Sequence, residues 1–176
     1  NIWLGSIPSY NSGPAGAFSR GDPETCEHES WLDLVPGGAV REIAVDDKYV
    51  YCAGGGKFFV WDPSEKEKVY EEDREVHSLV VAPNGLLVGS SGEEMFVFDR
   101  SQMEVRETFV SPIGVMTDMT VAPINILLCD MIDSPGLVHS ETWEGAKIAE
   151  EGGSLLAADG DSVLHFARGA KFHRLR

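Results

Sequence analysis

Apolar and polar positions alternate in short runs along most of this chain, and the clearest example lies between Val76 and Val105. This stretch, VHSLVVAPNGLLVGSSGEEMFVFDRSQMEV, holds four apolar or alternating runs separated by turns rich in Asn, Gly and Ser. β-Branched and aromatic residues on a two-residue period, with breakers between the runs, are typical of antiparallel strands. We predict strands at 79–81, 86–89, 95–98 and 104–109.

The same pattern recurs along the chain every 36 to 40 residues. Residues 40–69 align with this stretch with one single-residue gap near Asp47, 116–131 align without a gap, and 152–168 form a partial copy. A fixed period indicates a repeat architecture, and four antiparallel strands per repeat are typical of a propeller blade. We therefore predict an all-β fold, a β-propeller-like array of four-stranded antiparallel blades at 39–73, 75–110, 115–150 and 152–176.

One segment carries a competing helix signal. Ser64 begins a Ser-x-x-Glu pattern that can cap a helix extending to Leu79. The equivalent segment after Phe98 lacks this pattern, so we prefer strands in both repeats.

The repeat resembles a divergent WD40 repeat over residues 40–176. That family orders its inner strand, turn, middle strand and third strand in this way and ends the third strand with Trp-Asp. Trp61-Asp62 keeps the dipeptide, and Phe98-Asp99 is a near form of it. The resemblance implies a propeller that works by binding other proteins.

The sequence also departs from the WD40 pattern. The Gly-His pair usual before the inner strand is missing, and Gly55 and Gly92 replace the Asp usual in the turn six residues before the Trp position. The buried Asp-His-Ser-Trp network of that family therefore cannot form in the same way. Quinoprotein-like and NHL-like propellers, and a non-propeller antiparallel β domain, stay open as alternatives.

Residues 1–38 do not follow the repeat of the remaining chain. We predict that they form a partial blade with an insertion. Asn1 to Ser6 is typical of a middle strand entering its turn, and Ser30 to Val35 of a later strand. Ser9 to Glu29 is rich in Gly, Pro and Ser and lacks periodicity, so we predict an insertion loop there, mobile in isolation. The alternative is an adaptable binding loop.

The number of blades falls short of the seven usual in WD40 proteins, and an open propeller exposes long strand edges. The start at Asn1 and the tight spacing between Leu137 and Leu156 favour an incomplete or fragmentary ring. Three arrangements would cover the exposed strand edges: further blades beyond this sequence, a small four- or five-bladed ring joined between its end strands, or completion by a partner chain.

The net charge limits the kinds of partner molecule that we expect this chain to bind. With 29 acidic and 14 basic side chains, the formal net charge is -15, which repels phosphate and anionic lipid and favours basic protein surfaces. We expect no direct nucleic-acid binding and, since no apolar run approaches the roughly 20 residues that span a bilayer, no membrane insertion. Three cysteines without C-x-x-C spacing, and no N-x-S/T acceptor, favour an intracellular location, cytoplasmic or nuclear.

Three candidate functional sites, a phosphate loop, a nucleophilic serine and a metal site, do not match the residues that such sites require. The glycine run before Lys57 lacks the first Gly and the Ser or Thr of a phosphate loop, and is better explained as a turn between strands. Ser162, in Gly-Asp-Ser-Val near His165 and His173, falls where the repeat places a turn. Cys26-x-His28 lacks paired ligands, because Cys52 and Cys129 are predicted in middle strands that face a core. We predict no catalytic residue, no cofactor and no metal.

The preferred function is a non-catalytic scaffold that presents its loops to a protein partner within a larger complex or longer chain. The alternative is a propeller-based enzyme or a small-ligand or metal-binding module with its site in the central channel. Acidic residues at one shared repeat position would favour the alternative, and they are scattered instead. The predicted contact residues are Arg41, Asp46, His77, Asp118 and Asp130 in turns, and Tyr10, Trp31 and Trp143 as exposed aromatic anchors.

Overall fold

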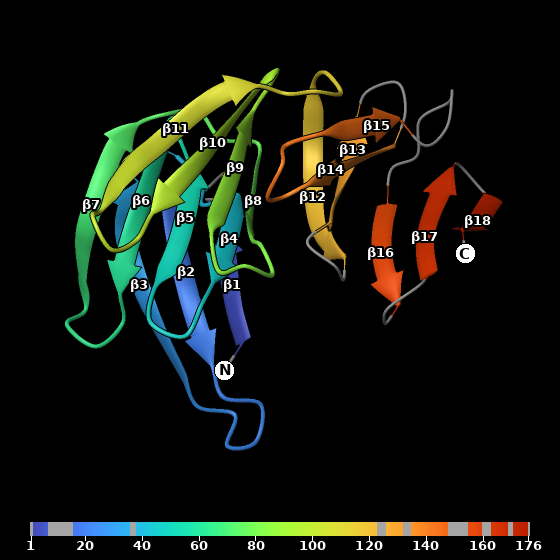
Figure 1. Cartoon of the computed structure of the whole chain (residues 1–176). Helices are drawn as coiled ribbons and strands as arrows, with labels where there is room; N and C mark the ends of the chain where they lie inside the picture. Colours follow the sequence, from blue (N-terminus) through green and yellow to red (C-terminus); the bar gives the residue numbers. More distant parts are fainter. Residues whose placement is uncertain are drawn as a thin grey trace. The chain divides into compact units, whose positions relative to one another are not determined.

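The computed structural model of this chain describes residues 2–6, 16–35, 38–122, 126–131, 135–147, 155–159, 163–168 and 171–175. Every regular element in these residues is a β-strand, and every strand pair is antiparallel (Figure 1). The chain divides into two units, residues 1–76 and residues 77–176. We call them unit 1 and unit 2.

Unit 1 contains two sheets, each formed by strands that are consecutive in the sequence. The first has the order β1-β2-β3 and the second the order β4-β5-β6-β7. The strands are β1 (Ile2–Ser6), β2 (Gly16–Gly21), β3 (His28–Val35), β4 (Glu42–Val45), β5 (Val50–Gly54), β6 (Lys57–Asp62) and β7 (Glu67–Asp73).

Unit 2 contains three such sheets, formed by β8–β11, β12–β15 and β16–β18. The first two sheets consist of β8 (Ser78–Val81), β9 (Leu87–Ser91), β10 (Glu94–Asp99), β11 (Glu104–Val110), β12 (Met116–Ala122), β13 (Ile126–Met131), β14 (Gly136–His139) and β15 (Gly145–Lys147). The third consists of β16 (Leu155–Asp159), β17 (Val163–Arg168) and β18 (Lys171–Leu175).

The four strands predicted between residues 79 and 109 are confirmed as β8 to β11. The single-residue gap near Asp47 falls in the turn between β4 and β5. A register shift also recurs at the same repeat position, between Val60 and Trp61 in one sheet and between Val97 and Phe98 in the next. The alternative helix from Ser64 to Leu79 is wrong, since the segment forms a turn followed by β7 and the start of β8.

The insertion loop predicted from Ser9 to Glu29 is wrong in part, because β2 lies within it. Residues 9–15 fall outside the described part of the chain, but 16–21 pair with β1 on one side and β3 on the other. Phe18 is fully buried and is the single large apolar residue of this strand. One apolar side chain is too weak a pattern to predict a strand, and here pairing along both edges supplies the order.

The core of unit 1 is an aromatic cluster between its two sheets. Trp61 of β6 meets the ring of Phe18 edge-on at 5.5 Å and the ring of Trp31 at the same centroid distance. Trp3 stacks on Trp31 with centroids 5.7 Å apart. Such pairs add about 0.5–1.5 kcal/mol each beyond the burial of their surface. The two pairs made by Trp61 join the β1–β3 sheet to the β4–β7 sheet.

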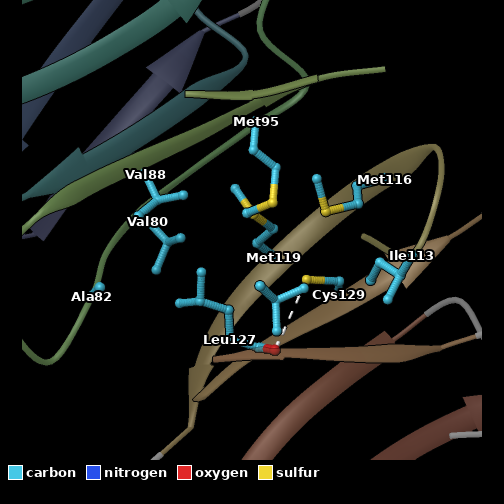
Figure 2. Packing of buried hydrophobic residues seen from close by; sticks show 10 residues of the cluster. Val80, Ala82, Val88, Met95, Ile113, Met116, Met119, Leu127 and Cys129 are labelled. Carbon is cyan, nitrogen blue, oxygen red and sulfur yellow. Dashed lines mark hydrogen bonds between the residues drawn. The ribbon is translucent and has the colours of Figure 1, made fainter. Parts of the chain in front are cut away.

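One core cluster of unit 2 is mainly aliphatic and rich in sulfur (Figure 2). Met95 of β10 lies with Met116 and Met119 of β12, and Cys129 of β13 completes the group. Methionine fills irregular gaps between packed sheets because its side chain is unbranched and flexible. Cys52 and Cys129 both lie in second strands and are fully buried, as predicted.

Four hairpins share one five-residue turn. Its first side chain accepts hydrogen bonds from backbone N–H groups inside the turn, which is how Asp stabilises tight turns. Its fifth residue has a positive φ of 53° to 59°, and these four are the non-glycine residues with positive φ in the described chain. The turns are Asp22–Cys26, Asp62–Lys66, Asp99–Met103 and His139–Trp143.

The recurring turn shows which strands are equivalent. It joins the third strand to the fourth in the sheets β4–β7, β8–β11 and β12–β15, but in the first sheet it joins β2 to β3. Hence β2 and β3 correspond to third and fourth strands, and β1 corresponds to a second strand. No described residues of the β1–β3 sheet correspond to the first strands β4, β8 and β12.

Candidate functional site

Unit 1 carries an open groove of about 490 Å³ at one end of its two sheets. Trp3 and Arg20 line it from the first sheet, and the remaining walls come from β4, from the start of β5 and from the turns that follow β4 and β6. Its apolar part and its charged part lie side by side. The lining residues are Trp3, Arg20, Ile43, Val45, Asp46, Asp47, Lys48, Tyr49, Val50 and Pro63.

Asp46 holds the shape of one wall. Its Oδ1 accepts hydrogen bonds from the backbone N–H groups of Lys48 and Tyr49, both at 2.7 Å, and its Oδ2 accepts one from the Tyr51 hydroxyl at 2.6 Å. The Lys48 ammonium lies 4.5 Å from the centroid of the Tyr49 ring, a cation–π distance. The turn therefore holds a positive charge at the groove, over the ring of the largely buried Tyr49.

Arg20 is held between aromatic rings and a carboxylate. Its guanidinium carbon lies 5.8 Å from the Trp3 ring and 5.9 Å from the Trp31 ring, and its Nη2 donates to Glu29 Oε2 at 3.1 Å. The hydrogen bond from Lys66 to Glu29, at 2.6 Å, and then the charge of Arg20 hold the pKa of that carboxyl below its usual range. Glu29 therefore stays ionised and Arg20 stays oriented near neutral pH.

A second, smaller hollow of about 250 Å³ lies on the other side of Arg20. Its lining adds Asp22, Glu27 and Glu29 to Arg20 and His28, so acidic groups outnumber basic ones. Backbone N–H groups of Glu24 and Thr25 hold the pKa of Asp22 below its ordinary value. This end of unit 1 therefore combines aromatic and aliphatic surface with a field that favours cations.

The predicted contact residues of unit 1 fall into different surroundings. Asp46 lies in the groove wall. Arg41 is exposed just before β4, and its backbone N–H donates to Ala53 O at 2.8 Å. Trp31 is half-buried in the aromatic core rather than an exposed anchor, because Trp3 and Trp61 pack against it. Tyr10 lies outside the described residues.

In unit 2, His77 is exposed, and its Nδ1 accepts a hydrogen bond from Gly92 N at 3.1 Å. Asp118 Oδ1 accepts from the Ser78 hydroxyl at 3.1 Å and ties β12 to β8. Asp130 pairs opposite Asp118 in the backbone register, and its side chain lies outside the described part. Trp143 is half-buried rather than an exposed anchor, because it packs against Phe109 with ring centroids 4.9 Å apart.

Two of the three candidate functional sites that were rejected from the sequence lie in described residues. Gly55 and Gly56 have φ of 58° and 74° and form the tight turn between β5 and β6, as predicted for the glycine run. No group of three or more His, Cys, Asp or Glu side chains in the described residues, Cys26 and His28 included, is arranged to hold a metal ion. Ser162 lies outside the described residues.

Most of the groove escaped the sequence analysis. Trp3 and Lys48 carry no motif, and Arg20 falls within the stretch that we predicted as a loop. The groove exists because β1, β2 and the β4–β5 turn meet in space. The one signal available in the sequence was Asp-Pro at Asp22 and again at Asp62, which marks equivalent turns and would have revealed β2.

Comparison of the chain with models of known protein families finds no match, and comparison with curated proteins finds none either. Across the described ranges, no helix is long and apolar enough to cross a membrane.

Proposed function

We propose that this chain is part of a WD40-like β-propeller that acts as a non-catalytic protein-binding scaffold, with the groove of unit 1 as its main contact surface. Its sheets are the blades, and the groove presents aromatic, aliphatic and charged side chains to a partner protein. The partner carries a basic surface.

The observation that carries the proposal is the combination of Trp3, Arg20 and the β4–β5 turn in one open groove. Trp, Tyr and Arg are the residue types most enriched in protein-binding hot spots, and all three are held in place here by their neighbours. Pre-ordered side chains lose less entropy on binding.

The repeat supports the propeller part of the proposal. Within unit 2, the first strands β8 and β12 of two consecutive sheets lie beside each other, and β16, which corresponds to a second strand, also lies beside β12. Blades arranged around an axis place their first strands in this way. An experimental structure in which the sheets do not surround a common axis would reject this part.

A photo-crosslinker at Asp47, an exposed position in the groove wall, tests the binding function in the native cells of the protein. The matched control carries the same crosslinker at Glu104, which is exposed on β11. We expect a defined protein to crosslink at Asp47 and not at Glu104, and the purified pair to form a stoichiometric complex in light scattering. Equal crosslinking at both positions, or no complex, would contradict the proposal.

A further inference from the structure

We propose that Asn84 is a modification site of this protein, at which the side-chain amide converts to aspartate and isoaspartate without an enzyme. Asn84-Gly85 is the single Asn-Gly pair in the sequence, and it lies in the turn between β8 and β9. Both residues are exposed, so water reaches them. The modification is a property of unit 2 that goes beyond the binding function proposed for unit 1.

The reaction needs only the chain and water. The backbone nitrogen of Gly85 loses its proton to hydroxide and attacks Cγ of Asn84. The N–Cγ bond forms, the Cγ–Nδ2 bond breaks, and the leaving nitrogen takes up a proton and departs as ammonia. Water then opens the cyclic imide at Cγ, which gives aspartate, or at the backbone carbonyl carbon, which gives isoaspartate. Glycine favours the attack because it has no side chain to hinder its nitrogen.

In the folded chain, the turn holds both reacting groups in other hydrogen bonds. The Gly85 N–H donates to Ala82 O at 2.8 Å, which keeps its proton in place. Asn84 Oδ1 accepts from the Leu86 N–H at 3.1 Å, which fixes the orientation of the Asn84 side chain. Asn stabilises turns through such bonds to the backbone that follows it. The attack therefore requires the turn to open, and the folded chain reacts slowly.

The Asn84 amide also links two sheets of unit 2. Its Nδ2 donates to the backbone oxygen of Ser140 at 3.4 Å, and Ser140 is fully buried in the turn between β14 and β15. A carboxylate at position 84 lacks this donor and places a negative charge near the Ser140 oxygen. The modification therefore weakens the contact between the two turns.

Isoaspartate changes the backbone as well, because its chain continues through Cγ and is one carbon longer. The added carbon alters the spacing of a turn in which the Ala82 N–H donates to Leu86 O at 2.8 Å. Val80, Ala82 and Val88 flank this turn and are buried in the sulfur-rich core cluster of unit 2 (Figure 2). The modification therefore loosens β8 and β9.

The test follows the conversion at mildly alkaline pH in the full chain, folded in buffer and unfolded in urea. Peptide mapping by mass spectrometry quantifies aspartate and isoaspartate at position 84. We expect conversion at least about tenfold slower in the folded chain, because it waits for local opening. In the unfolded chain, Asn11 and Asn125 are internal controls that should convert more slowly than Asn84, since Ser and Ile follow them.

Pro83→Ala tests whether the turn controls the rate. Pro83 is exposed and precedes Asn84, and its ring restricts the backbone of the open turn. The substitution should raise the rate in the folded chain about two- to fivefold and leave the rate in the unfolded chain unchanged. Circular dichroism checks that the variant keeps its strands, and the comparison of folded with unfolded chain needs no substitution.

Hydrogen exchange tests the structural consequence. Ion exchange separates the modified chain by its added negative charge, and its amides in β8 and β9 should exchange at least about fivefold faster than in the unmodified chain. Asn84→Asp carries the carboxylate on a normal backbone and should show a smaller increase, because it loses the bond to Ser140 O but keeps the spacing of the turn.

Any of four results would overturn this proposal. They are equal rates in the folded and unfolded chains, conversion of Asn84 no faster than that of Asn11 and Asn125 in the unfolded chain, no effect of Pro83→Ala in the folded chain, and unchanged hydrogen exchange of β8 and β9 after modification. None of them bears on the crosslinking test at Asp47, so the scaffold proposal stands or fails separately.

Discussion

At the residue scale, the three cysteines differ in their surroundings and therefore in their reactivity. Cys26 is exposed in the first turn, whereas Cys52 and Cys129 are fully buried. Burial raises the pKa of the Cys52 thiol far above its ordinary value and that of Cys129 to about 12. The thiolate is the reactive form of cysteine. Both buried thiols are therefore unreactive for two reasons: surrounding residues block access to them, and they stay protonated.

We expect one thiol per chain to react with Ellman's reagent at pH 8 in the native state, and three after unfolding in guanidinium chloride. Cys26→Ser should abolish the fast native reaction and leave the slow one, whose rate reports opening of the cores. Fast reaction of two or more thiols in the native chain would contradict the burial of Cys52 and Cys129.

At the element scale, close approach between strands depends on single glycines. Gly89 of β9 pairs with Phe96 of β10, and a Cβ at Gly89 would overlap the Phe96 ring, which is fully buried. Gly89→Ala should therefore destabilise the protein by about 1–3 kcal/mol, as overpacking of cores does. Urea unfolding followed by circular dichroism measures the change in the free energy of unfolding.

Gly21→Ala is the matched control, because a Cβ there would meet no heavy atom of the described residues within 4 Å. It should change the free energy of unfolding by less than about 0.5 kcal/mol. A second substitution, Phe96→Leu, should recover part of the loss in Gly89→Ala because it removes the ring. If the two changes are additive, the proposed overlap is not the cause.

The sequence predicted the elements well where the pattern was strong and poorly where it was weak. β8 to β11 follow from alternation and turn residues, both of which act over a few neighbouring positions. β2 did not follow, since only Phe18 marks it and its order comes from pairing with β1 and β3. Of the groove, only Asp46 was among the predicted contact residues, because Trp3 and Lys48 are brought together by packing between sheets.

At the scale of the whole molecule, the chain divides into two compact units, and the cluster that contains Leu127 lies within unit 2. Leu127 is fully buried in the core of unit 2, and Leu127→Ala should destabilise that unit by about 2–5 kcal/mol through lost contacts and a cavity. We expect hydrogen exchange to accelerate in β8–β15 while amides of β5 and β6 in unit 1 keep their protection. Equal acceleration in both units would show that the chain opens as one cooperative body.

The sequence by itself determined the all-β class, the period of the repeat, and the turn at Gly55–Gly56. These depend on local backbone preferences and on the alternation of apolar side chains, which neighbouring residues encode. The tertiary structure decided which surface is left open. Val45 and Val121 are equivalent in the repeat, yet Val45 is exposed and Val121 is partly buried, because burial is set by contacts between residues far apart in the chain.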